Sequence, residues 1–228
     1  MNFRISDTFT GSLIKLTARE QKSIKTTIFD LQVNPAQSSL SFHKIERAKD
    51  TNFWSIRASS DLRVIIHKTA ADLLVCYVGH HDDAYHWAQR RKIEQHPQTG
   101  AIQLIEIRQR VEEISKFVSA KEKAVTPRQL PLFENVEDEA LLSFGVPFEW
   151  LCDVRLATEE SLLDLADHLP QEAAEALLEL ATGGTPETVT KTATKGFEHP
   201  DTQRRFRLVT NENELALALD YPWDKWTI

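Results

Sequence analysis

Four short runs of β-forming residues follow one another between residues 40 and 79, and they constrain the fold more than any other feature. They are rich in β-branched and aromatic residues, and short polar turns separate them. The runs read LSFHKIER, FWSIRAS, LRVIIHKT and LLVCYVG. Because the links are too short for crossover helices, the four strands are predicted to form an antiparallel meander.

The residues on either side of the meander predict one more strand and packed helices. The opening run FRISDTF alternates loosely and is expected to form an edge strand. Thr17 and Glu20 have the spacing of a capping box, and a helix is expected from there to the proline that follows Asn34. A second helix, from about Asp82 to Ile93, is expected to close the unit.

The second half of the chain is predicted to be mainly helical. Residues 101–118 carry apolar side chains at spacings of three and four, which is typical of a helix with a narrow apolar seam. Residues 136–182 predict several short helices, one of them capped by Thr158 and the last ended by a glycine. The residues after 183 read as a linker, and the tail is expected to add a strand and a helix.

The charge is divided between the two halves of the chain. Residues 1–100 hold 14 Lys and Arg against 10 Asp and Glu, a net of +4. Residues 101–228 hold 13 against 24, a net of −11. The first half is therefore expected to meet a phosphate backbone, and the second would be repelled by one unless its charge faces away.

The composition is that of a soluble globular protein. No window approaches the roughly 18 apolar residues of a membrane span, and the N-terminus does not have the pattern of a secretory signal. Cys76 and Cys152 are far apart, and both are expected to be buried thiols in a reducing compartment. We therefore expect a cytoplasmic protein without a membrane partner.

Groups that can transfer protons gather at the end of the last predicted strand. His80, His81 and Tyr85 follow this strand, and Arg57 and Arg63 lie on neighbouring strands, where they are expected to share a face. Arginine neutralises phosphate, and an imidazole or a phenol can move the proton of a 2′-hydroxyl. The alternative is a polar helix start with solvated histidines and packed aromatic side chains, and the pattern alone favours this alternative.

Several other kinds of site are not indicated. The chain has no G-x-x-x-x-G-K-[ST] phosphate loop and no G-x-S-x-G elbow. A metal site is not expected, because contiguous residues such as His80 and His81 seldom converge on one ion without a more distant ligand. No cofactor is expected in this chain.

The segment FWSIRASSDLRVIIHKTAADLLVCYVGHHDDAY resembles the closing part of the RelE/ParE toxin superfamily. The resemblance covers about residues 1–95 and implies a strand, two helices and a four-strand meander. In ribosome-dependent members such as RelE, basic residues and a tyrosine of this region cleave mRNA. Carried over by position, the candidates here are Lys44, Arg57, Arg63, His81 and Tyr85.

Two features depart from that family pattern. His81 stands where the family has an arginine, and Asp82 and Asp83 follow it directly. Negative charge beside the scissile phosphate would oppose catalysis. ParE-like members are not ribonucleases, so the resemblance does not decide the activity.

A second resemblance covers more of the chain. The segments VGHHDDAYHWAQRRKIE, LLSFGVPFEWLCDVR and PWDKWTI are similar to the region that precedes the motor in certain bacterial UvrD/Rep-like superfamily 1 helicases. This similarity implies that the chain is a fragment and that a helicase motor would follow in cis. ATP and Mg²⁺ would be cofactors of that full-length protein.

The expected fold class is α+β: a RelE/ParE-like antiparallel sheet with packed helices, then a small all-α domain and a C-terminal tail. The expected divisions are residues 1–95, 96–135, 136–182 and 183–228.

The leading functional hypothesis is a nucleic-acid-binding or regulatory region of a helicase. The alternative is a ribosome-dependent mRNA endoribonuclease in which His81, Tyr85 and Arg63 act. A third possibility is that the acidic helices cover the basic patch as a built-in inhibitor. The residues expected to bind nucleic acid are Lys44, Arg57, Arg63, His80, Arg90 and Arg91.

Overall fold

The computed structural model describes residues 1–37, 40–107, 130–186 and 194–220, and the chain forms two compact units. The first unit comprises Met1–Ile93 together with Gly196–Ile228, and the second comprises Glu94–Lys195. The chain therefore returns to the first unit after passing through the second, a return that the expected division of the sequence did not include.

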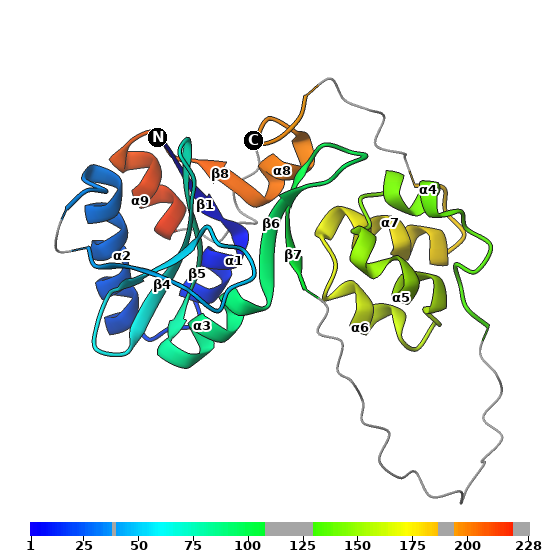
Figure 1. The fold of residues 1–228 in the computed structure, drawn as a ribbon, viewed down its shortest axis with the longest axis horizontal. Helices are drawn as coiled ribbons and strands as arrows, with labels where there is room; N and C mark the ends of the chain where they lie inside the picture. The colour runs from blue at the N-terminus through cyan, green and yellow to red at the C-terminus, as the bar shows by residue number, and fades with distance from the viewer. Residues whose placement is uncertain (38–39, 108–129, 187–193, 221–228) are drawn as a thin grey trace, which may run out of the picture. The chain divides into compact units, whose positions relative to one another are not determined.

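The first unit is built on a six-stranded, mostly antiparallel sheet (Figure 1). Its strands are β1 (Asn2–Ser6), β2 (Phe42–Lys44), β3 (Phe53–Arg57), β4 (Leu62–Lys68), β5 (Asp72–His80) and β8 (Phe206–Leu208), in the order β2-β3-β4-β5-β1-β8. Neighbours from β2 to β5 pair antiparallel, so the predicted meander and the α+β fold class are confirmed.

The first strand was expected at an edge of the sheet, and this prediction was wrong. β1 pairs parallel with β5 on one side and antiparallel with β8 on the other. Phe3, Arg4, Ile5 and Ser6 are all buried, as an inner strand requires. Local alternation could not reveal this position, because the partner strand β8 lies about 200 residues further along the chain.

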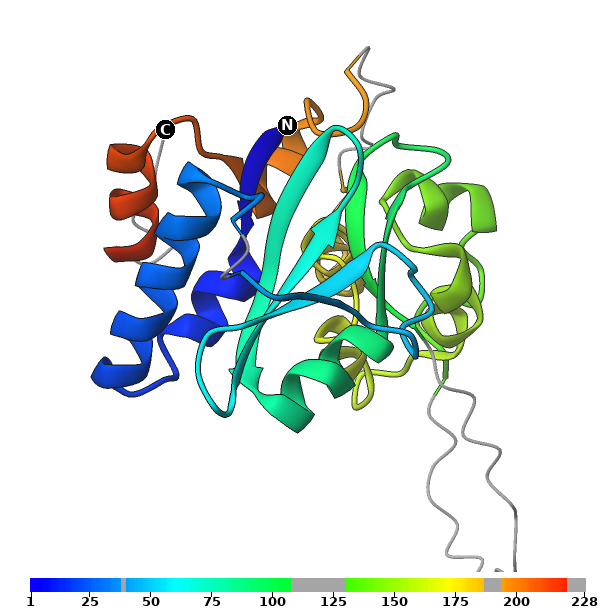
Figure 2. The same cartoon turned by 60° about the vertical axis from the view of Figure 1, so that its left-hand side comes forward.

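Five helices lie in the described part of this unit. They are α1 (Asp7–Leu13), α2 (Ala18–Val33), α3 (His81–Gln89), α8 (Pro200–Arg205) and α9 (Glu212–Asp220). The predicted capping box of α2 is present, with Thr17 and Glu20 each accepting from the backbone of the other. Although α2 and α9 are distant in sequence, they lie side by side in both ribbon views (Figures 1 and 2).

The two faces of the sheet are covered by different helices. Ile24, Ile28 and Leu31 of α2 are buried in one core cluster with Val64 and Ile66 of β4. Residues between these positions on β4 and β5 face the other way. On that second face, Trp87 of α3 stacks on Tyr77 and meets the ring of Phe53 edge-on.

The helix that closes the meander ends earlier than expected. It was predicted to reach Ile93, but α3 stops at Gln89 and β6 runs from Arg91 to Gln95. The amide of Ile93 donates to the Asp50 carboxylate at 3.0 Å instead of to a helical carbonyl. A contact with a residue 43 positions away therefore decides this end.

The second unit is mainly helical. β6 pairs with β7 (Ile102–Glu106), and the helices are α4 (Asp138–Ser143), the 3₁₀ turn η1 (Phe148–Trp150), α5 (Leu151–Leu156), α6 (Leu162–Ala166) and α7 (Gln171–Ala181). Its core includes Trp150, Val154 and Leu177. As predicted, α7 ends at a glycine, and Gly183 has a φ of 82°.

Two local predictions in this unit were wrong. Residues 102–106 form a strand, not the start of a helix over 101–118, because the turn that follows His96 brings β7 beside β6. Short apolar runs do not distinguish strand from helix by spacing alone. The residues of that predicted helix beyond 107 lie outside the described residues. The N-cap of α6 is Ser161, whose hydroxyl accepts from the amide of Thr158, so Thr158 is not the cap.

Candidate functional site

The register of the meander places Arg57 and Arg63 on one face of the sheet. The two residues are direct partners across the antiparallel pair of β3 and β4. Ser55 lies two positions before Arg57 and therefore shares that face. The hydroxyl of Ser55 bonds to that of Tyr85 on α3, so the arginines and α3 lie on the same side of the sheet.

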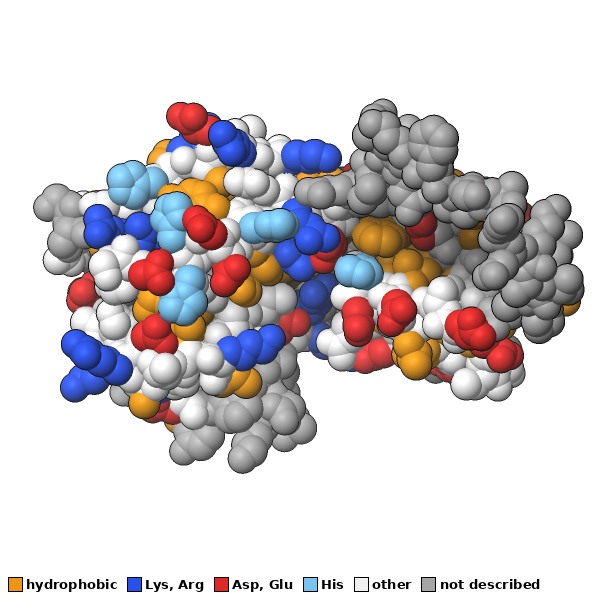
Figure 3. All heavy atoms as spheres, turned by 90° about the horizontal axis from the view of Figure 1, so that it is seen from below, with side chains coloured by type: hydrophobic (Ala, Val, Ile, Leu, Met, Phe, Trp, Pro, Cys, Tyr) orange, Lys and Arg blue, Asp and Glu red, His pale blue; other side chains and the backbone are white. Residues whose placement is uncertain are grey.

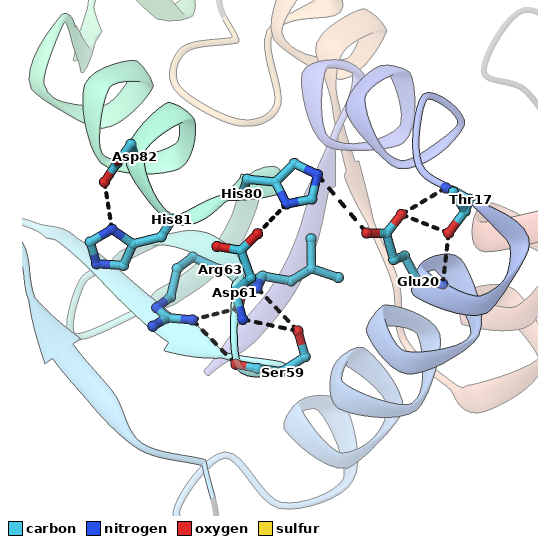
Figure 4. Close-up of polar contacts among 9 residues, drawn as sticks. Thr17, Glu20, Ser59, Asp61, Arg63, His80, His81 and Asp82 are labelled. Atoms are coloured by element: carbon cyan, nitrogen blue, oxygen red, sulfur yellow. Dashed lines mark hydrogen bonds and ion pairs between the residues drawn. The ribbon is translucent and has the colours of Figure 1, made fainter.

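The two arginines are held by the turn between their strands. Nε of Arg57 donates to the carbonyl of Ser59 at 3.0 Å, and Nη1 of Arg63 donates to the same carbonyl at 3.3 Å. Figure 4 shows Arg63 directed at this turn. Both guanidinium groups therefore already bind backbone carbonyls.

His80 and His81 are neighbours in sequence, but they point apart (Figure 4). His80 is the partner of Leu62 in the sheet and turns toward α2. Its Nδ1 lies 2.6 Å from Asp61, and its Nε2 lies 3.9 Å from Glu20. The hydrogen bond to Asp61 raises the pKa of His80 above its ordinary value, and the same bond lowers the pKa of Asp61. His80 thus belongs to an ion-pair cluster beside α2.

His81 and Tyr85 lie on the first two turns of α3 and contact each other. Their ring centroids are 4.7 Å apart, and Nδ1 of His81 lies 2.8 Å from the Asp82 carboxylate. The Tyr85 hydroxyl is 3.0 Å from Oγ of Ser55. The sheet therefore positions the phenol of Tyr85 through Ser55, and the Tyr85 ring in turn contacts the imidazole of His81.

A cleft of about 520 Å³ opens between α3 and the segment that follows β2. We call it the basic cleft. It is lined by Lys44, Ile45, Glu46, Arg47, His81, Asp82, Tyr85, His86 and Gln89. The cleft brings together Lys44, His81 and Tyr85 of the predicted residues, whereas Arg57 and Arg63 are not among its lining residues.

Two basic residues that line the basic cleft, Arg47 and His86, were missed by the sequence analysis. Arg47 follows Lys44 by three positions in the run KIERAK, and this local concentration of positive charge was a signal that could have been used. His86 carries no such signal, because its position depends on how α3 packs against the sheet. Both side chains are exposed.

Lys44 and Arg47 are available to a ligand. Both are exposed, and within the described part of the chain neither forms a hydrogen bond or an ion pair. The cleft also contains two carboxylates, those of Glu46 and Asp82. Figure 3 views this end of the first unit, where histidines, cations and carboxylates are interspersed.

The other predicted binding residues, Arg90 and Arg91, lie at the end of α3. Nη1 of Arg90 is 3.5 Å from Nε2 of His86, which links it to a residue of the basic cleft. The guanidinium of Arg91 stands over the ring of Trp87, 4.9 Å from its centroid, and donates to the carbonyl of the same residue.

A buried hydrogen bond between His67 and Asp50 lies on the same face of the sheet, outside the basic cleft. Nε2 of His67 is 3.1 Å from Oδ2 of Asp50, and both side chains are less than 10% exposed. Burial raises the pKa of Asp50, but the hydrogen bonds from His67 and from two backbone amides outweigh it, so that the pKa is lowered. This pair fixes the loop before β3 to the sheet.

The two cysteines differ in their surroundings. Cys76 is fully buried, and burial raises the pKa of its thiol. Cys152 is exposed on α5, so the prediction that both thiols are buried was wrong for this residue. A helix with one apolar face buries only part of its residues, and Cys152 lies on the outer side.

Two further observations bear on the class of site. Among the described residues, no group of three or more His, Cys, Asp or Glu side chains is placed to hold a metal ion. No helix in the described ranges is long and apolar enough to cross a membrane.

Comparisons with known proteins give little further guidance. No family model and no curated protein matches the sequence. Among solved structures, a copper-bound mutant toxin from Helicobacter pylori aligns with a TM-score of 0.31 and 15% identity. The alignment covers 36% of this chain and 97% of that chain. A likeness at this level does not decide the function.

Proposed function

We propose that the first unit binds the phosphate backbone of a nucleic acid in the basic cleft. The observation that carries this proposal is the pair of exposed cations, Lys44 and Arg47, that form no ion pair within the described residues. Surface cations that the protein itself does not neutralise can pair with phosphates. This pairing releases the counterions condensed on the nucleic acid, and the release favours binding.

The aromatic wall of the cleft supports a single-stranded ligand. His81 and Tyr85 present two rings in tilted contact, 43° between their planes, beside the cations. Unpaired bases stack on such rings, and the interaction tolerates any sequence. The carboxylates of Glu46 and Asp82 oppose binding, so we expect modest affinity with a strong dependence on salt.

Binding is tested by fluorescence anisotropy with labelled single-stranded RNA, single-stranded DNA and duplex DNA. The double variant Lys44→Ala/Arg47→Ala should bind single strands about tenfold more weakly. Its slope of log K against log salt should be smaller by about 1.4, because two phosphate contacts are lost.

The matched control is Lys15→Ala/Lys22→Ala. It removes the same charge from exposed lysines beside and on α2. It should bind like the unaltered chain. Equal losses in both double variants would show general electrostatic attraction and would overturn the assignment to the basic cleft.

A second candidate function is cleavage of mRNA by a RelE-type endoribonuclease acting at the ribosome. The observation that favours it is the contact between His81 and Tyr85 within the same cleft. One of them would accept the proton of a 2′-hydroxyl, whose oxygen attacks the phosphorus. The other would give a proton to the leaving 5′-oxygen, so that a cyclic phosphate remains.

Cleavage is tested by inducing the chain in bacterial cells and mapping the ends of mRNA. Growth arrest that Tyr85→Phe abolishes would support the endoribonuclease. Normal growth with intact mRNA would contradict it. Binding without cleavage remains compatible with the first proposal, because Tyr85→Phe keeps the ring that stacks.

A separate proposal concerns the larger protein. We propose that the chain is an accessory region of a UvrD/Rep-like helicase whose motor, in cis, uses ATP and Mg²⁺. This proposal rests on the sequence resemblance alone. Reading the coding sequence after Ile228 tests it directly: a phosphate-loop motif shortly downstream is expected, and a stop codon there would contradict it.

A further inference from the structure

The helical segment of residues 148–156, formed by η1 and α5, is apolar on its outer side as well as on its inner side. Trp150, Leu151 and Val154 of this segment are buried in the core. Phe148 and Leu156 are 75% and 70% exposed. A surface helix ordinarily carries polar residues opposite its core face, so these exposed side chains are not explained by folding.

The exposed residues follow the spacing of a helix. Phe148, Cys152 and Leu156 are separated by four residues each and lie on successive turns through η1 and α5. Cys152 and Leu156, four residues apart within α5, lie on the same face of this α-helix, and Phe148 lies in the 3₁₀ turn that leads into it. We call these three residues the apolar stripe. It spans eight residue steps, or roughly 12 Å.

The sequence on either side of the apolar stripe is strongly acidic. Residues 130–186 contain thirteen Asp and Glu and one cation, Arg155. Arg155 lies on α5 and pairs with Asp138 at 3.3 Å, so its charge is already balanced. Figure 3 shows acidic and apolar side chains next to one another on this unit.

We propose that the apolar stripe is a docking site for a basic amphipathic helix of a partner protein. The negative charge of residues 130–186 argues against the other common ligands of an exposed apolar surface. Nucleic acids and anionic membranes would be repelled by the carboxylates. A second copy of the same surface would bring two acidic faces together, and like charges at an interface oppose association.

The geometry fits a helix as the occupant. Two anchor side chains about two turns apart match the spacing at which an amphipathic helix presents its apolar residues. Lysine or arginine on the flanks of such a helix would meet carboxylates on either side of the stripe, of which Glu149 and Glu159 are exposed. This proposal concerns the second unit and does not depend on the basic cleft.

The probe is a fluorescein-labelled peptide of about 18 residues, with leucine at helical spacing and lysine elsewhere. Its anisotropy is measured with the full chain. The double variant Phe148→Ser/Leu156→Ser should bind at least about tenfold more weakly, because removing the central anchors of an interface usually has effects of this size. Circular dichroism should be unchanged, since both side chains are exposed.

Two controls separate the stripe from general charge attraction. Ile14→Ser removes a similarly exposed apolar residue of the first unit and should leave the affinity unchanged. A peptide with glutamate in place of lysine should not bind. Equal affinity of the double variant and the unaltered chain would overturn the proposal.

Self-association is the remaining alternative, and sedimentation velocity tests it. The full chain should sediment identically with and without the Phe148→Ser substitution. A dimer that this substitution dissociates would assign the apolar stripe to a second copy of the chain and would also overturn the proposal.

Discussion

The hydroxyl of Tyr85 lies 3.0 Å from Oγ of Ser55, and this hydrogen bond ties α3 to the middle of β3. Ser55 is fully buried, whereas Tyr85 is half-buried and lines the basic cleft. The bond thus connects the wall of the candidate site with the interior of the sheet.

Tyr85→Phe should destabilise the fold by about 1 kcal/mol, the usual net contribution of one hydrogen bond. The phenyl ring keeps its contact with His81, so single-stranded RNA should bind with unchanged affinity. Urea denaturation and anisotropy measure the two effects. Unchanged stability would show that the bond that Ser55 already donates to the carbonyl of His43, at 3.5 Å, is sufficient.

The buried carboxylate of Asp50, which bonds to His67, should make stability depend on pH. Because the folded pKa of Asp50 is lowered, its contribution is present above the unfolded pKa of about 3.9 and is lost as the pH falls through the folded value. Asp50→Asn should destabilise the protein by about 2–4 kcal/mol at pH 7, because the buried carboxylate accepts bonds from His67 and from the amides of Asn52 and Ile93.

Denaturation at pH 7 and at pH 3 checks this expectation. The difference between the two proteins should shrink at the lower pH. Asp30→Asn, which changes an exposed carboxylate of α2, is the control and should have little effect. A constant difference at both pH values would contradict the assignment.

His80 should titrate above the ordinary range of histidine because Asp61 accepts its hydrogen bond. Since the folded pKa is raised, any stabilisation is present below the unfolded pKa and is lost as the pH rises through the folded one. In Asp61→Asn the pKa of His80 should fall toward its ordinary value. NMR titration of the imidazole measures it, and an unchanged pKa would refute the role of Asp61.

The segment that returns after residue 196 should be required for the first unit to fold stably. Leu215 of α9 is fully buried in the main core, whereas Leu217 on the same helix is 47% exposed. Leu215→Ala should cost about 2–5 kcal/mol. Leu217→Ala should cost less than about 1 kcal/mol. Equal losses measured by urea denaturation would show that α9 does not pack as described.

Local sequence signals were reliable where the deciding contacts are close along the chain. The four strands, the capping box at Thr17 and the glycine that ends α7 all depend on neighbouring residues. Local signals failed where a residue distant along the chain decides the structure. Residues 102–106 were predicted as helix but form a strand. Ile93 was predicted to end the helix, but its amide donates to the carboxylate of Asp50.

The predictions about the candidate site succeeded and failed for the same reason. The sequence drew attention to the end of β5, and alternation correctly placed Arg57 and Arg63 on one face. It could not reveal that both bind the carbonyl of Ser59, or that His80 turns toward α2. Those outcomes depend on turn geometry and on which helix covers each face.

The amino-acid sequence by itself determined the meander, the helical second unit and the division of charge, because periodicity, caps and turns act over a few residues. Only the tertiary structure decided that β8 joins β1, that α9 completes the core, and that His86 lines the same cleft as Lys44. These contacts join segments from about 40 to 200 residues apart, and no local pattern specifies which distant surfaces will bury one another.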